Sequence, residues 1–170
     1  TVPIYPLAPE HKLPAVEAMM GEVYRQVLGE GGDVAIAGDS AGGTLALALT
    51  MTAAKEGWPL ASSLLLISPG IDMSLANPKV RDYAGIDPWL DIPGGTEAMR
   101  LYAGDIPLDD WRISPLYGDL SVLPPTLAFS GTLYWLEKDY VSFTALVLPL
   151  SNDGTEIDMG VMGLDFELPV

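Results

Sequence analysis

The chain has 170 residues, of which 49% are hydrophobic and 18% are charged, a balance typical of a globular domain with a sizeable core. Its formal net charge of −15 argues against nucleic acid and anionic membrane surfaces as partners, since both are themselves negatively charged. It contains no cysteine, which excludes disulfides, thiolate catalysis and cysteine-ligated metals. Its apolar runs are too short to span a membrane and no signal peptide is recognisable, so we expect a cytoplasmic protein.

Short apolar runs typical of β-strands alternate along the chain with longer segments of helical periodicity. Strands are predicted, in chain order, at residues 2–5, 34–37, 63–67, 126–130 and 155–159. Helices are predicted at residues 14–28, 41–56, 93–102 and 138–148, and the proline-interrupted stretch 68–92 is predicted to be a loop insertion. This alternation is typical of an α/β fold with a mostly parallel sheet and helices on both faces, built as a single domain over residues 1–170.

One run between a predicted strand and a predicted helix carries chemistry: Gly38-Asp39-Ser40-Ala41-Gly42-Gly43. It fits the pattern G-x-S-x-G, a sharp turn that exposes a nucleophilic serine at the carboxyl end of a sheet. Gly38 and Gly42 are expected to remove side chains that would clash in this turn. Ser40 is the predicted nucleophile, and the N–H group of Ala41, at the helix N-terminus, is the predicted donor to an oxyanion. A similar run occurs in chymotrypsin-like proteases on an all-β barrel, which the helical pattern after Ser40 contradicts.

Five segments are similar to the motifs of one family in the right order: Y-P-L-A-P-E-H at 5–11, G-D-S-A-G-G at 38–43, S-P-G-I-D at 68–72, S-P-L at 114–116 and L-P-P-T at 123–126. The first departs from the family's Y-R-L-A-P-E-H, because Pro6 stands in place of arginine. On these motifs the chain resembles the hormone-sensitive-lipase-like branch of the α/β-hydrolases, which are carboxylesterases and lipases. The resemblance implies an α/β-hydrolase fold and hydrolysis of small or medium acyl esters through an acyl-enzyme on Ser40. We expect no cofactor and no metal ion, because the carboxylates show no ligand spacing.

The resemblance also implies a catalytic acid and a catalytic histidine, and this chain has other residues at both positions. The family's acid lies in a run G-T-x-D-x-L, which aligns with G-T-L-Y-W-L at 131–136 and places Tyr134 at the acid position. Its histidine lies in a run such as G-M-x-H-D-F, which aligns best with M-G-L-D-F at 162–166 and places Leu164 at the histidine position. A serine without a base is a weak nucleophile, so the resemblance predicts an impaired enzyme.

Other residues are candidates for parts of the site, each with a structural alternative. The carboxylates of Glu137, Asp139 and Asp165 lie close to the altered positions, but acids in such loops are usually solvated surface groups. His11 is the single histidine of the chain and is expected to be a structural loop residue. Four large side chains are candidates for an acyl pocket, with core packing as the alternative: Trp89, Leu90, Tyr102 and Trp135.

Nothing in the chain resembles the N-terminal part of the family, which supplies the first strands, part of a cap and a His-Gly-Gly loop of the oxyanion hole. Residues 2–5 resemble the family's fourth strand, and the third strand would lie between them and residues 34–37. We therefore expect an N-terminally truncated domain with an unpaired edge, an aggregation hazard unless it is covered. Another chain that supplies the missing strands, or a homo-oligomer, would cover it; a natural short form with a rearranged edge is the alternative.

Two functions from different classes remain open on the sequence. The first is a serine carboxylic-ester hydrolase with a small-molecule acyl ester as substrate, which the intact run around Ser40 favours. The second is a catalytically inactive binding or scaffold protein of the same fold, which Tyr134 and Leu164 favour. Its pocket would bind a hydrophobic small molecule, or its exposed edge a partner chain.

Overall fold

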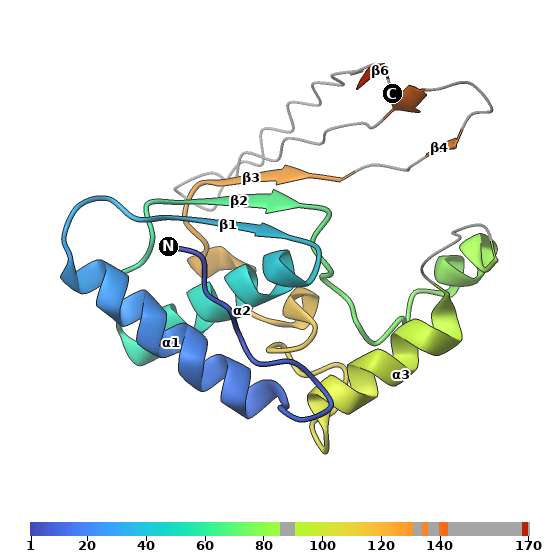
Figure 1. Ribbon diagram of the computed structural model, residues 1–170, viewed down its shortest axis with the longest axis horizontal. Coiled ribbons are helices and arrows are strands. Elements are labelled where there is room, and N and C mark those ends of the chain that lie inside the picture. The colour runs from blue at the N-terminus through green and yellow to red at the C-terminus, as the bar shows by residue number, and fades with distance from the viewer. Residues whose placement is uncertain (86–90, 131–133, 136–139, 143–167, 170) are drawn as a thin grey trace.

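The computed structural model describes residues 1–85, 91–130, 134–135, 140–142 and 168–169. Its main sheet has three parallel strands, in the order β1 (Ala35–Asp39), β2 (Ser63–Ile67) and β3 (Thr126–Phe129). Ala37 is in register with Leu65, which pairs in turn with Leu127. β1 is therefore an edge strand of this sheet, whereas β2 has a partner on each side (Figure 1).

A second, antiparallel sheet consists of β4 (Tyr134–Trp135), β5 (Tyr140–Ser142) and β6 (Leu168–Pro169). Tyr134 is in register with Ser142, and Val141 is in register with Leu168. The helix predicted at 138–148 is therefore wrong at Tyr140–Ser142, where an aromatic and a β-branched residue favour a strand. The strand predicted at 155–159 lies outside the described residues.

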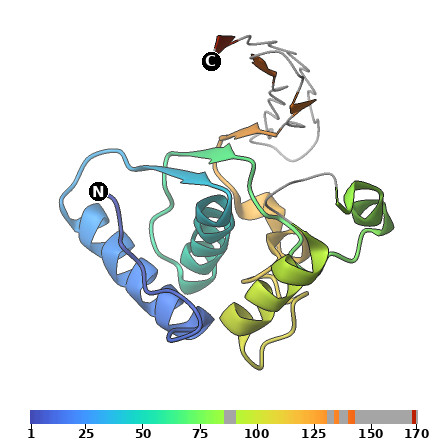
Figure 2. The ribbon, with the colours of Figure 1, turned by 45° about the vertical axis from the view of Figure 1, so that its right-hand side comes forward.

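Three α-helices lie on the same side of the main sheet in both ribbon views (Figures 1 and 2): α1 (Leu13–Gly29), α2 (Ala41–Glu56) and α3 (Ile92–Ala103). Short 3₁₀ turns connect the elements: η1 (Pro78–Tyr83), η2 (Pro115–Tyr117) and η3 (Leu120–Val122). On β2, Leu64 and Leu66 are almost completely buried, whereas Leu65 and Ile67 are 36% and 45% exposed. Among the described residues, helices thus cover one face of the sheet. None of the described helices is both long and apolar enough to cross a membrane.

Helix α2 occupies the centre of the helical layer and is buried along most of its length. Its alanine and leucine residues favour a helix and pack in two directions. On one side Leu47 packs with Leu64 and Leu66 of β2, and on the other Leu49 packs with Tyr24 of α1. The helix ends at Gly57, whose φ of +69° lies in the left-handed region that suits glycine. The N-terminus of α2, and with it Ser40, is thus fixed by a well-packed core.

The segment before α1 is not a strand, so the strand predicted at 2–5 is wrong. It runs from beside β1 to the start of α1, which begins at Leu13 with Pro14 in its first turn (Figures 1 and 2). Val2 and Ile4 are 87% and 91% exposed, and Pro3 has no N–H group to donate to a ladder. Without a neighbouring strand to pair with, this apolar segment does not form part of a sheet.

Candidate active site

Ser40 lies at the junction of β1 and α2, in a backbone conformation that few side chains adopt. Its φ and ψ are +52° and −116°, and its side chain is exposed. A non-glycine residue at positive φ costs on the order of 1–3 kcal/mol and persists only where its surroundings hold it. Such strain and an exposed serine are typical of a nucleophile elbow, the sharp turn between a strand and a helix that exposes a nucleophile. We call the turn at residues 38–43 the elbow.

The backbone of Ser40 is held on both sides of its strained φ angle. Its N–H group donates to the carbonyl of Ile67 at 2.9 Å, which continues the pairing between β1 and β2. Its carbonyl accepts from the N–H groups of Gly43 at 3.0 Å and Thr44 at 3.2 Å in the first turn of α2. The N–H group of Gly70, beyond β2, also points to this carbonyl at 3.4 Å. The turn is thus fixed by both its own helix and the neighbouring strand.

Two glycines of the elbow are required by close packing, but they are not the two expected from the sequence. A Cβ on Gly38 would lie 2.3 Å from the carbonyl oxygen of Gly42, as predicted. A Cβ on Gly42 would meet nothing within 4 Å, so the clash predicted there is wrong. The second tight position is Gly43, where a Cβ would lie 2.7 Å from the Cβ of Pro69. The sequence contained no signal for this contact beyond the matched S-P-G-I-D motif, because it joins residues 26 positions apart.

The N–H group of Ala41, the predicted oxyanion donor, lies at the N-terminus of α2. Ala41 is the first residue of α2, and the first N–H groups of a helix have no acceptor within it. The N–H groups of Gly43 and Thr44 are bound to Ser40, whereas that of Ala41 has no backbone acceptor among the described residues. The positive end of the helix dipole lies at the same place and favours a developing negative charge. Asp39, also exposed, ends β1 just before the nucleophile.

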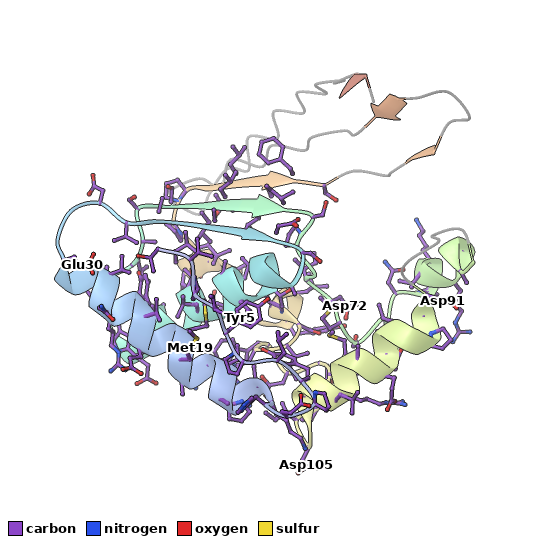
Figure 3. All side chains as sticks on the ribbon, in the orientation of Figure 1. Tyr5, Met19, Glu30, Asp72, Asp91 and Asp105 are labelled. Carbon is purple, nitrogen blue, oxygen red and sulfur yellow. The ribbon has the colours of Figure 1, made fainter. Side chains whose placement is uncertain are left out.

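A groove of about 320 Å³ runs along the free edge of β1 and reaches the elbow at Asp39 and Gly42. Its walls come from the segment before α1, from α1 and from α2, and they are mostly apolar. Tyr5, labelled in Figure 3, belongs to the first of these walls. The groove therefore lies at the side of β1 where the sequence predicted an unpaired edge.

Residues 1–153 match the family described as having the alpha/beta hydrolase fold. The chain belongs to this family. It is 38% identical over 135 residues to a triacylglycerol lipase of Mycobacterium tuberculosis, covering 78% of this chain and 26% of the lipase. It is 38% identical over 143 residues to an esterase of Acinetobacter venetianus, covering 82% and 47%. The chain thus spans about a quarter to a half of the length of these curated relatives.

Solved structures confirm the resemblance to the hormone-sensitive-lipase-like α/β-hydrolases. An esterase from the bacterial hormone-sensitive lipase family is 35% identical, with a TM-score of 0.69 over 74% of this chain and 43% of that one. The esterase EstE5, soaked with ethyl alcohol, is also 35% identical, with a TM-score of 0.70 over 75% and 44%. Both matches cover less than half of the solved chains.

Of the two positions that this α/β-hydrolase chain is predicted to use to assist Ser40, the structure describes only that of the acid. Tyr134 lies in β4, where its backbone pairs with Ser142. Leu164 lies outside the described residues, as do the carboxylates proposed as substitutes, Glu137, Asp139 and Asp165. The assignment of Tyr134 and Leu164 to the two altered positions stays a prediction.

The structure describes the surroundings of only one of the four acyl-pocket candidates, Tyr102. Trp89 and Leu90 lie outside the described residues, and Trp135 is described only as part of β4. Tyr102 packs against a buried cluster of Leu13, Ala103 and Ile113, which favours the core alternative. Its hydroxyl is buried with no hydrogen-bond partner among the described residues. Burial raises the pKa of Tyr102, and the negative charge of Glu17 raises it further.

His11 is exposed on the turn before α1, where its N–H group donates to the carbonyl of Leu7 at 3.0 Å. This backbone role fits the structural loop residue that the sequence predicted. No group of three or more histidine, aspartate or glutamate side chains that would suit a metal ion occurs in the described part of the chain.

A cluster of charged side chains connects α1 to the loop that follows α3. Arg112 donates from Nε and Nη2 to the carboxylate of Asp110, both at 2.9 Å, and its Nη1 lies 3.5 Å from Glu17 of α1. The hydrogen bonds from Arg112 lower the pKa of Asp110, although partial burial opposes them. Burial raises the pKa of Glu17, and the Arg112 charge offsets part of that rise. This cluster therefore joins α1 to the loop that follows α3.

Proposed function

We propose that this chain carries the nucleophile of a serine carboxylic-ester hydrolase that acts on small or medium acyl esters. The observation that supports the proposal is the exposed Ser40 at a strained, positive φ, held by Ile67 and by the first turn of α2. An exposed serine has no packing reason to occupy such a conformation, whereas a nucleophile gains access to substrate from it. The relatives named above are an esterase and a lipase, which is consistent with this chemistry.

The proposed reaction forms and then hydrolyses an ester bond to Ser40. The hydroxyl oxygen of Ser40 attacks the carbonyl carbon of the ester and gives up its proton, and the N–H group of Ala41 donates to the oxygen that becomes negative. The bond to the alcohol then breaks, and the alcohol leaves with that proton. Water attacks the acyl-serine in the second half of the cycle and releases the carboxylic acid and free Ser40.

The proposed enzyme is impaired, because the residues expected to assist Ser40 are Tyr134 and Leu164. Leucine cannot accept a proton, and tyrosine is a poor base at neutral pH. Serine hydrolases that lack members of the triad keep only about 10³–10⁴-fold catalysis over water. We therefore expect slow acylation of Ser40 rather than rapid turnover.

A fluorophosphonate probe followed by mass spectrometry tests this proposal, since it reacts with activated serines. We expect slow but stoichiometric labelling of Ser40, and none in the Ser40→Ala variant. Ser62 serves as an internal control, because it is another exposed serine in the described residues and its hydroxyl donates to Val34. Equal labelling of Ser40 and Ser62, or no labelling together with no hydrolysis of a p-nitrophenyl ester, would reject the enzyme.

A second candidate function, binding of an apolar small molecule without catalysis, is favoured by the groove beside β1. Its volume of about 320 Å³ lies at the lower end of the range of ligand sites, and its walls are mostly apolar. The groove would keep this capacity whether or not Ser40 is activated. Pairing of the β1 edge with another chain or a second copy stays a prediction.

Fluorescence of an anilinonaphthalene sulfonate dye tests the binding function. A tryptophan at Val23, which lines the groove, would fill it and abolish the dye's fluorescence increase. The matched control is Val80→Trp, because Val80 is also partly exposed but lies in η1, outside the groove. Equal dye binding by both variants would show that the groove is not the binding site.

A further inference from the structure

The first turn of α2 is bound to the segment that follows β2 through the side chain of Thr44. Thr44 is 6% exposed, and its Oγ1 donates to the carbonyl of Gly70 at 2.6 Å. The same oxygen lies 3.4 Å from the carbonyl of Ser40. One buried hydroxyl therefore lies between the backbone of the predicted nucleophile and that of Gly70, which is 26 residues beyond Thr44 in the sequence.

The loop 68–70 also contacts the elbow through its own backbone. The N–H group of Gly70 points to the carbonyl of Ser40 at 3.4 Å, and Gly43 and Pro69 approach so closely that a Cβ on Gly43 would not fit. The loop is anchored in turn to the main sheet, because the N–H group of Ser68 donates to Phe129 of β3 at 2.7 Å. The strained turn thus packs against a segment that is itself hydrogen-bonded to β3.

We propose that Thr44 is a positioning residue, whose hydroxyl fastens the loop 68–70 onto the elbow and thereby holds Ser40 in its strained conformation. This role rests on the proposed function only in that Ser40 must present its hydroxyl to a substrate. Strain at a functional residue persists when the surrounding structure over-determines it, and the Thr44 bond supplies one of the few restraints that come from outside the elbow. Thr44 itself need not touch the substrate.

Helix α2 contains a natural control for this role. Thr50 is 1% exposed, and its Oγ1 donates to the carbonyl of Ala46 at 2.8 Å, within the same helix. Replacing either threonine with valine removes a buried hydroxyl of similar burial from the same element. Only the Thr44 change, however, breaks a bond between α2 and the loop beyond β2.

The decisive experiment measures fluorophosphonate labelling of Ser40 in the whole chain and in the variants Thr44→Val, Thr44→Ser and Thr50→Val. We expect Thr44→Val to lower the maximal labelling rate at least ~10-fold while the concentration for half-maximal rate changes little. Thr44→Ser retains the hydroxyl and is expected to restore most of the rate, and Thr50→Val is expected to react like the unchanged chain. Equal rates for the two valine variants, or a serine variant as slow as Thr44→Val, would overturn the proposal.

Hydrogen exchange of the same four proteins separates failure of this proposal from failure of the ester-hydrolase function. In Thr44→Val we expect faster exchange in peptides that contain the N–H groups of Ser40 and Gly70, with little change elsewhere. Thr50→Val should leave these peptides unchanged. If no protein is labelled but Thr44→Val alone shows faster exchange, Ser40 is unreactive and Thr44 still holds the turn; unchanged exchange in Thr44→Val rejects the positioning role.

Discussion

The main sheet and the short antiparallel sheet contain different parts of the expected catalytic apparatus, and the described strands that carry these parts differ in length. Ser40 follows a five-residue strand that pairs with β2 at five positions, and it precedes a helix buried in the core. Tyr134 lies in a two-residue strand that pairs with β5 at two positions. Among the described residues, the nucleophile is therefore supported by a five-residue ladder and a buried helix, and the position of the acid by a two-residue ladder.

This difference separates the residues that the fold requires from those that catalysis requires. Gly38 and Gly43 contact backbone or proline atoms so closely that the fold needs them in an active and an inactive protein alike. The side chain of Ser40 is exposed and fills no space in the core. The glycines of the elbow therefore indicate ancestry, whereas the serine and the two altered positions bear on activity.

The largest expected effect is the loss of the elbow's packing in Gly38→Ala. The new Cβ would lie 2.3 Å from the carbonyl oxygen of Gly42 and 2.6 Å from the backbone nitrogen of Gly43. Both are backbone atoms, so no side-chain rotation can relieve the clash. We expect a loss of at least about 4 kcal/mol in the free energy of unfolding, or no folded protein. Urea unfolding followed by circular dichroism measures it. Gly42→Ala is the control, with open space for its Cβ and an expected change below about 1 kcal/mol; equal stability of the two variants would contradict the packing argument.

The two faces of β2 offer the next test, because neighbouring leucines on one strand differ in burial. Leu64 is 2% exposed and packs with α2, whereas Leu65 is 36% exposed on the opposite face. Leu64→Ala is expected to lower the free energy of unfolding by about 2–5 kcal/mol, and Leu65→Ala by clearly less. Urea unfolding of both variants measures the difference. A similar loss in both would mean that the second face is covered as fully as the first.

Restoring the two altered positions tests the chemical side of the comparison. The double variant Tyr134→Asp with Leu164→His would supply a carboxylate and an imidazole where the resemblance places them. We expect the labelling rate of Ser40, and hydrolysis of a p-nitrophenyl ester, to rise by roughly 10²-fold or more, since general-base assistance typically contributes 10²–10⁴-fold. The single variants are the controls and should each give much smaller increases, because Tyr134→Asp supplies no base and the imidazole of Leu164→His lacks the acid that holds it in the correct tautomer. No increase in the double variant would show that these positions do not approach Ser40.

Much of the main sheet and the elbow could be predicted from the sequence, because local patterns determine them. The strand at Ser63–Ile67 and the helix at Ala41–Glu56 have the predicted limits, and Ser40 lies in a sharp turn between a strand and a helix, as predicted. The strand predicted at 2–5 failed because strand formation depends on a neighbour as well as on apolar residues. The contacts of Thr44 and Gly43 could not be predicted, since they join segments that are brought together only by the parallel pairing of β1 and β2.

The smallest expected effect comes from the Arg112 cluster, which sharpens the contrast between close packing and polar contacts. Because Arg112 lowers the pKa of Asp110 in the folded chain, this carboxylate stabilises the fold above its unfolded pKa and loses that contribution as the pH falls through the folded value. Glu17 has the opposite sign: its pKa is raised by burial, so its contribution is present below the unfolded pKa and disappears as the pH rises through the folded value.

Asp110→Asn should therefore cost under about 1 kcal/mol at pH 7, and the difference from the unchanged chain should shrink as the pH falls below about 4. Glu17→Gln should cost less than Asp110→Asn at pH 7, because it removes a carboxylate whose charge burial disfavours while giving up only a 3.5 Å ion pair. Urea unfolding at several pH values between 3 and 7 gives both differences. If Asp110→Asn ran parallel to the unchanged chain over this whole range, the bidentate contact would contribute nothing through ionisation. The link between α1 and the loop after α3 would then rest on apolar packing, such as that of Leu13 with Ile113.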